Sequence, residues 1–248
     1  MEQISNFFGT ILKFFYDISG EYYLAIIFFT IVTKLILLPF TFSQMKSQAA
    51  MKRVQPKIDA INKKYKGNPQ KQNELLQRLY KENNVNPLAG CLPLLVQFPV
   101  IMAMYNVVRD PVKFVFKSQE VYDAIQKGFF WINSLSNVDA IPIALGGKTI
   151  GLPGILPILS AISTYYSIRM TTAKASNSSE NQNEMMKSMN SSMQVMMPMM
   201  MLFFGITLPS GLVLYWVVGT IVQIIQQYFI GKYEEKHFNE NKTKSVKN

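Results

Sequence analysis

The sequence has almost none of the side chains from which catalytic and metal sites are usually built. It contains one cysteine, Cys91, and one histidine, His237, in 248 residues. A single cysteine excludes a disulfide within the chain, and we expect Cys91 to be a small packing residue. His237 lies in a charged tail, so the sequence offers neither a nucleophile–base pair nor a zinc-type ligand set. It also lacks a phosphate-binding loop. We therefore expect no enzymatic activity, no metal and no cofactor.

Charged residues are also scarce, at 16% of the chain, and they cluster, which leaves long runs with almost no charge. About 20 apolar residues in a helix are needed to cross a bilayer. The pattern predicts an all-α integral membrane protein with five transmembrane helices. The expected spans are residues 22–42, 88–108, 151–168, 193–208 and 211–230.

The basic residues predict how these spans are oriented. The net charge is +10, and residues 43–87 alone hold ten basic and three acidic side chains. Cytoplasmic loops of membrane proteins carry such an excess. Residues 1–21 and the loop 109–150 are then outside, and the loop 169–192 and the tail 231–248 are cytosolic. Because the charge flanks apolar runs, it suits membrane topology and anionic lipid better than nucleic acid, and we expect no sequence-specific nucleic-acid binding.

Two segments outside the spans show helical periodicity. Residues 1–21 predict an amphipathic helix in the outer interface, because Phe7, Ile11, Phe14 and Ile18 recur at helical spacing. Residues 43–87 predict a basic cytosolic helical hairpin with a turn at Gly67-Asn68-Pro69. The hairpin is either a solvated link between two spans or a docking surface for ribosome, nascent chain or lipid.

Lys34 is the only charged residue inside any expected span. Placing an ammonium at the centre of a membrane helix costs roughly 2.5–3.5 kcal/mol on insertion scales. No Asp or Glu occurs within the five spans. A water-filled cavity or an anionic ligand is the usual way to offset this cost, and a lysine held only for packing is the competing interpretation.

The other polar side chains of the spans gather in their cytosolic halves. A channel needs polar residues through both halves, so the pattern predicts a blind pocket that is open to the cytosol. Ordinary polar contacts between helices are the alternative. Nine methionines between positions 185 and 201 form either a docking surface for varied apolar partners or a helix core. The candidate pocket residues are Lys34, Thr30, Thr41, Gln97, Ser163, Ser167, Thr220 and Gln223.

Three motifs carry a family resemblance. They are TKLILLP at 33–39, followed by QMK at 44–46; NPLAGCLP at 86–93, continuing to QFP at 97–99; and PSGLVLYW at 209–216. Together with the five-span plan, they resemble the YidC membrane protein insertase family in its compact bacterial form.

The resemblance implies an insertase and chaperone that inserts and helps fold nascent membrane proteins through a cytosol-open hydrophilic groove. Lys34 stands where the family usually has arginine, which keeps the charge but loses the planar fork of donors. Trp216 matches an aromatic position of the last span, and Ser163 or Ser167 takes the place of a family glutamine. The implied location is a bacterial cell membrane, and the implied partners are nascent membrane proteins, lipids, the Sec translocon and the ribosome. The alternative function is a small-solute transporter, which would need an inverted repeat or polar residues in both halves of the spans.

Overall fold

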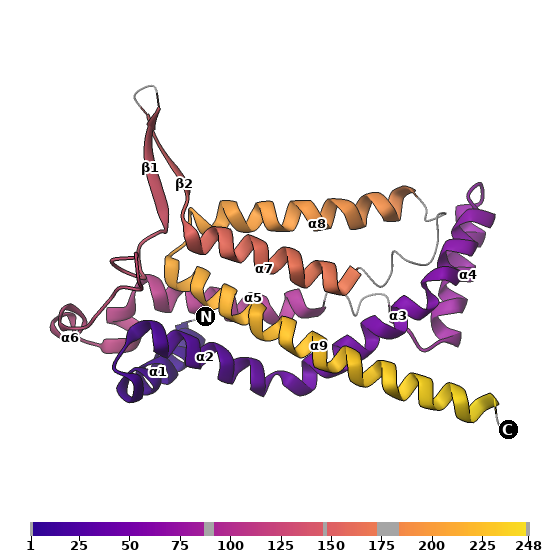
Figure 1. Cartoon of the computed structure of the whole chain (residues 1–248), viewed down its shortest axis with the longest axis horizontal. Helices are drawn as coiled ribbons and strands as arrows, with labels where there is room; N and C mark the ends of the chain where they lie inside the picture. The colour runs from indigo at the N-terminus through magenta and orange to yellow at the C-terminus, as the bar shows by residue number, and fades with distance from the viewer. Residues whose placement is uncertain (1, 87–91, 146–147, 173–183, 247–248) are drawn as a thin grey trace. The chain divides into compact units, whose positions relative to one another are not determined.

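The computed structural model is mostly helical and describes residues 2–86, 92–145, 148–172 and 184–246 (Figure 1). Within these ranges, side chains are described for residues 2–51, 53–86, 96–143, 151–170 and 194–233. The chain forms two compact units. The first comprises Met1–Ile36, Leu94–Ser167 and Val195–Gln223, and the second comprises Leu37–Pro93, Ile168–Gln194 and Ile224–Asn248.

The secondary structure follows a simple order along the chain. The helices are α1 (Glu2–Ser19), α2 (Tyr22–Ile36), α3 (Leu38–Lys64), α4 (Pro69–Glu82), α5 (Leu92–Arg109), the π-helix η2 (Val112–Phe116), α6 (Gln119–Ala124), α7 (Ile155–Thr172), α8 (Glu184–Gly205) and α9 (Ser210–Val246). Strands β1 (Ala140–Leu145) and β2 (Lys148–Pro153) form an antiparallel pair before α7.

The core of the first unit joins segments that are far apart in the sequence. Fully buried side chains come from α1, α2, α5, the loop before β1, and α9, and include Leu12, Ile26, Met104, Leu135 and Leu212. Helix α1 packs closely on η2 through Gly9, where a Cβ would lie 2.0 Å from the carbonyl oxygen of Phe114. Only glycine allows this approach.

Helix α1 has a second apolar face that the described residues leave exposed. Phe7, Phe14 and Ile18 are 60–67% exposed, while Leu12 on the opposite face is fully buried. A helix that is apolar on both faces suits a boundary between protein and lipid. The position of α1 in the outer interface remains a prediction.

A single loop segment satisfies the free backbone donors at the starts of α7 and α9. The backbone N–H groups of Ser210 and Gly211 donate to the carbonyls of Asn137 and Leu135, at 2.7 and 2.8 Å. The carboxylate of Asp139 accepts from the backbone N–H of Leu156 at 2.8 Å. Helix N-termini carry unsatisfied donors and partial positive charge, so these acceptors stabilise both ends. The loop thereby fixes where two helices of the first unit begin.

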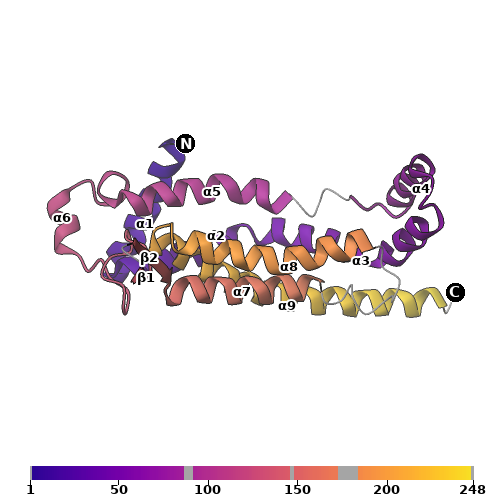
Figure 2. The ribbon, with the colours of Figure 1, turned by 90° about the horizontal axis from the view of Figure 1, so that it is seen from above.

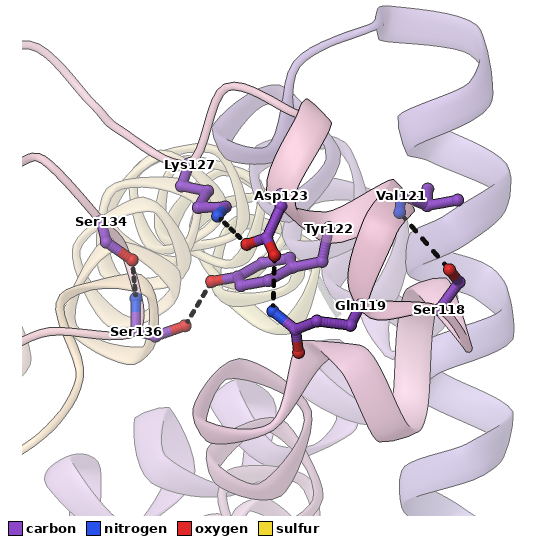
Figure 3. A network of polar contacts seen from close by, with 8 residues as sticks. All are labelled: Ser118, Gln119, Val121, Tyr122, Asp123, Lys127, Ser134 and Ser136. Atoms are coloured by element: carbon purple, nitrogen blue, oxygen red, sulfur yellow. Dashed lines mark hydrogen bonds and ion pairs between the residues drawn. The ribbon is translucent and has the colours of Figure 1, made fainter.

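A polar network supports the same loop from α6 (Figure 3). The hydroxyls of Tyr122 and Ser136 are 3.1 Å apart, and Ser136 also donates to the carbonyl of Val108. Asp123 accepts hydrogen bonds from Lys127 and Gln119, and the bond from Lys127 is the main reason that the pKa of the Asp123 carboxyl is lowered. The network ties α6 and the end of α5 to the capping segment.

In the second unit, α3 and α4 occupy the region for which the sequence predicts a helical hairpin. Val54 and Ile58 of α3 pack with Leu79 of α4, and Val85 closes this small core. The side chain of Asn68 accepts from the backbone N–H of Lys71 at 3.1 Å, which caps α4. Burial raises the pKa of Tyr80, which packs against the same core.

Helix α3 begins earlier than the hairpin prediction, directly after a break at Leu37. Pro39 explains the break, because its ring disfavours helical geometry before it and it lacks an N–H. Tyr22–Ile36 and Leu38–Met51 are long and apolar enough to cross a membrane only when taken together. Among the described residues, Ser210–Tyr233 is long and apolar enough by itself, and Gln194–Gly205 is a shorter apolar helix. The count of five spans therefore stays a prediction.

The strand pair is absent from the all-α prediction. It occupies the end of the predicted outer loop and the start of the predicted third span, so that α7 begins at Ile155 rather than at 151. Gly151, Pro153 and Gly154 disfavour helix there. Helix α8 begins at Glu184, inside the predicted loop 169–192. In the methionine-rich segment, Met201 is buried and Met196 and Met199 are exposed, whereas positions 185–193 lie outside the described side chains.

Replacing Asp139 with alanine should destabilise the protein. The substitution removes the cap of α7 and the acceptor for the indole N–H of Trp131, 3.2 Å from the carboxylate. We expect a loss of about 2 kcal/mol in unfolding free energy, or roughly 4–8 °C in Tm, by thermal denaturation in detergent. Asp123→Ala is the control. That carboxylate is exposed and bonds only Gln119 and Lys127, not the capping segment, so the Tm of this variant should stay close to that of wild type. Equal shifts for the two variants would contradict the capping role.

Candidate functional site

Lys34 lies in the last turn of α2, directly over a glycine of α9. A Cβ added at Gly219 would be 3.2 Å from Cε of Lys34 and 3.9 Å from its Nζ. The same Cβ would lie 3.6 Å from Cγ2 of Thr30, one turn earlier on α2. Any larger residue at position 219 would occupy space that the lysine side chain now uses.

A cavity of about 110 Å³ opens beside this contact. Three helices of the first unit contribute to it, α2 with one residue, α5 with two, and α9 with five. A cavity of this size with several polar groups can hold a few water molecules. Its lining residues are Lys34, Gln97, Ile101, Tyr215, Trp216, Gly219, Thr220 and Gln223.

One hydrogen bond in the cavity wall joins α5 to α9. The side-chain amide of Gln97 donates to the hydroxyl of Tyr215 at 3.0 Å. The hydroxyl of Thr220 instead donates within its own helix, to the carbonyl of Trp216 at 2.8 Å. Threonine can bond in this way inside a helix and keep an oxygen lone pair available as an acceptor.

The structure brings together five of the residues singled out from the sequence. Lys34, Gln97, Trp216, Thr220 and Gln223 all line the cavity. Lys34 is the one charged side chain among the described residues that line it. The arrangement can therefore hold water and attract a negatively charged or polar group within an otherwise apolar helical unit.

The remaining candidates lie elsewhere. Thr30 is fully buried behind the cavity and donates to the carbonyl of Ile26 at 2.6 Å. Ser163 donates to the carbonyl of Ser160 at 3.1 Å, and Ser167 is buried on the same helix, but neither lines the cavity. Thr41 belongs to the second unit, where its hydroxyl donates to the carbonyl of Leu37.

Sequence reasoning missed three lining residues, Ile101, Tyr215 and Gly219. The spacing of residues along α9 could have identified Tyr215 and Gly219. Every fourth residue lies on one face of a helix, and this face carries Gly211, Tyr215, Gly219 and Gln223. A Cβ at Gly211 would lie 2.8 Å from Val108 and 3.2 Å from Ile26. Small residues at such spacing let membrane helices approach closely.

The residues that the structure describes contain no group of three His, Cys, Asp or Glu side chains that could hold a metal ion. The polar groups that line the cavity are amide, hydroxyl, indole and ammonium groups. These groups can attract, hydrate and orient a ligand.

Comparison with known proteins places these features in a family. The model of the 60Kd inner membrane protein family matches residues 14–237. The membrane protein insertase YidC of Clostridium perfringens is 38% identical over 219 residues, which cover 87% of this chain and 80% of the relative. That of Caldanaerobacter subterraneus is 33% identical, with 92% and 94% covered.

Longer proteins match over part of their length. The chain covers 38% of the membrane protein insertase YidC of Endomicrobium trichonymphae, at 36% identity. It superimposes on a crystal structure of an active YidC insertase with a TM-score of 0.59 and 30% identity, over 88% of this chain and 44% of that one. The resemblance carried by the three sequence motifs is confirmed, and the chain belongs to the 60Kd inner membrane protein family, whose bacterial relatives are named YidC membrane protein insertases.

Proposed function

We propose that this chain is a membrane protein insertase that receives the polar part of a nascent membrane protein in the cavity around Lys34. The observation that carries the proposal is the convergence of Lys34, Gln97, Thr220 and Gln223 on one small cavity of a membrane protein. The names of the relatives support the same activity.

The proposed topology has five spans, with the N-terminus outside and the tail in the cytosol. At 1.5 Å per residue, Lys34 is about 18 Å from the start of α2, and Gln223 is about 20 Å from the start of α9. Both depths lie past the middle of a hydrocarbon core about 30 Å thick. The cavity is then in the cytosolic half of the bilayer, where a substrate arriving from the ribosome can enter.

The free energy of moving a substrate into the membrane shows what the cavity must contribute. On insertion scales, a span of 20 leucines gains roughly 6–12 kcal/mol, whereas each charge carried to the centre costs roughly 2.5–3.5 kcal/mol. Partitioning alone can therefore carry a polar tail with only a few charges. A hydrated cavity reduces the depth of lipid that the tail must cross, and Lys34 attracts acidic groups to it. The apolar segment of the substrate moves along exposed side chains such as Ile158 and Ile162 of α7.

The cytosolic partners follow from the basic segments. The hairpin of α3 and α4 supplies lysines and arginines, and the tail 231–248 supplies lysines, for contact with a ribosome, a nascent chain or anionic lipid. We include in this proposal that the protein inserts substrates either alone or together with the Sec translocon.

The charge of Lys34 should control insertion of substrates with acidic tails. In vesicles that contain the purified protein, Lys34→Arg should insert a single-span substrate with an acidic N-terminal tail as wild type does. Lys34→Ala should slow insertion about tenfold, since it removes an attraction of about 1–2 kcal/mol, and Lys34→Glu should slow it further. Protease protection of the tail measures the rate.

Two controls make this test specific. Lys13→Ala alters a partly exposed lysine of α1 that pairs with Asp17 and does not line the cavity, and it should have no effect. A substrate with a neutral tail should be insensitive to Lys34→Ala. If all four proteins with different residues at position 34 insert the acidic substrate equally, Lys34 is a packing residue and the charged-cavity mechanism is wrong.

The cavity also makes a steric prediction at Gly219. Gly219→Leu fills space now used by Lys34 and should reduce insertion about as much as Lys34→Ala, while Gly219→Ala should act weakly because the flexible end of the lysine can move. Gly231→Leu is the matched control on the same helix, since no atom lies within 4 Å of a Cβ there. Full activity of Gly219→Leu in the same vesicle assay, with Tm unchanged, would refute the proposed use of the cavity.

A further inference from the structure

The β1–β2 hairpin presents an aliphatic face that no part of the described protein covers. Its register pairs Ile141 with Leu152 across the strands, and Ile143 follows Ile141 by two residues. Cross-strand partners and alternate residues share a face of a strand pair. Ile141, Ile143 and Leu152 are 56%, 36% and 46% exposed. Neighbouring exposed aliphatic side chains are typical of a surface that contacts lipid or another molecule.

The direction of the hairpin limits what can cover it. Figure 1 shows the strands projecting sideways from the start of α7, across the direction of that helix, and Figure 2, turned by 90°, shows them near the same end of the helix. Only Gly154 separates β2 from α7. If α7 crosses the bilayer, a hairpin that projects sideways from its outer end runs along the membrane surface.

Helix α7, which follows the hairpin in the sequence, also carries exposed aliphatic side chains. Ile155, Ile158 and Ile162 are 45–48% exposed and follow one another at spacings of three and four residues, which is one helix face. In a membrane-spanning helix, such an exposed stripe faces lipid. The exposed aliphatic residues of the hairpin thus lie close in the sequence to the start of this stripe.

Two aromatic side chains lie near the base of the hairpin. The indole N–H of Trp131 donates to Asp139, the residue before β1, while the residue remains 44% exposed. Phe130 is 88% exposed and has φ of 48°. The left-handed backbone at Phe130 follows from a two-residue turn, because Phe129 and Ile132 exchange backbone hydrogen bonds at 2.8 Å, and the turn leaves the ring of Phe130 in the open. Aromatic residues with satisfied polar groups concentrate at membrane–water interfaces.

The base of the hairpin is held firmly. The backbone N–H of Gly154 donates to the carbonyl of Asp139 at 3.0 Å, and the carboxylate of Asp139 caps α7. A Cβ at Gly154 would lie 2.2 Å from this carboxylate. Asp139 therefore links the base of the hairpin to the start of α7, so the position of the strands and the position of the helix are coupled.

We propose that the aliphatic face of the β1–β2 hairpin, together with Phe130 and Trp131, lies in the outer headgroup region of the bilayer and anchors the outer end of α7 there. The inference rests on the proposed topology, in which α7 is a span that begins outside. Lipid is favoured over a protein partner because the side chains of the face carry no charge and because only Gly154 separates β2 from α7, whose exposed stripe faces lipid in the proposed topology.

Depth-dependent quenching tests this placement in the full chain. In a Cys91→Ser background, single cysteines at Ile141, Ile143, Pro142, Ile158 and Glu120 are labelled with the environment-sensitive fluorophore NBD. The proteins are reconstituted in phosphatidylethanolamine–phosphatidylglycerol vesicles with shallow or deep spin-labelled phosphatidylcholine. Labels at 141 and 143 should emit at shorter wavelength than the label at 120, and shallow spin labels should quench them best. Pro142, on the opposite face of the strand, should be quenched less.

The label at 158 separates this proposal from the topology on which it rests. Deep spin labels should quench it if α7 is a span. If the label at 158 is quenched but the labels at 141 and 143 behave like the label at 120, the hairpin is not in the membrane. The proposal is then overturned, while the topology stands. If 158 is not quenched, the topology itself fails. Shielding of 141 and 143 in native membranes but not in pure lipid vesicles would identify a protein partner instead and would also overturn the proposal.

Discussion

Helix α9 meets helix α2 through a face on which Gly211 and Gly219 stand two turns apart. The close approach at Gly211 seats α9 against Val108 and Ile26, and the approach at Gly219 leaves room for the long side chain of Lys34. A lysine in an apolar helix is costly unless water or polar groups surround it. The glycine provides that space, and the cavity beside it supplies Gln97, Thr220 and Gln223. The rest of the candidate site depends on this helix–helix contact.

The end of the first unit at which α7 and α9 begin holds the contact in register. The segment from Leu135 to Asp139 accepts hydrogen bonds from the first residues of both α7 and α9, so the two helices start at fixed positions. The polar network around Tyr122 and Ser136 connects this segment to the end of α5. Because α5 and α9 both line the cavity, the hydrogen bonds at the start of α9 and at the end of α5 also help to position the cavity walls.

Much of the site could be predicted from the sequence because charge and polarity are so rare in the spans. Lys34 stands out by itself, and Gln97, Thr220 and Gln223 follow from their place along each helix. Tyr215 was missed because a tyrosine ring is largely apolar and its hydroxyl alone does not mark it as a site residue, and Gly219 because glycine has no polar side chain. Their spacing of four residues along α9 was the available signal. Ser163 was expected from its position in the span and from family resemblance, yet its hydroxyl bonds within its own helix. The strand pair was missed because its apolar residues resemble the start of a span. The break at Leu37 was missed because the effect of Pro39 on a helix depends on the local backbone.

Site-specific photocrosslinking tests the central claim most directly. A photoreactive amino acid at Thr220, in the cavity, is compared with one at Ile221, which is 47% exposed on α9. A ribosome-stalled substrate with an acidic tail is presented to each protein. The account predicts that position 220 captures the polar tail, and that position 221 captures the apolar segment or lipid. Equal capture of the tail at both positions, or insertion without any contact at 220, would contradict a substrate path through the Lys34 cavity.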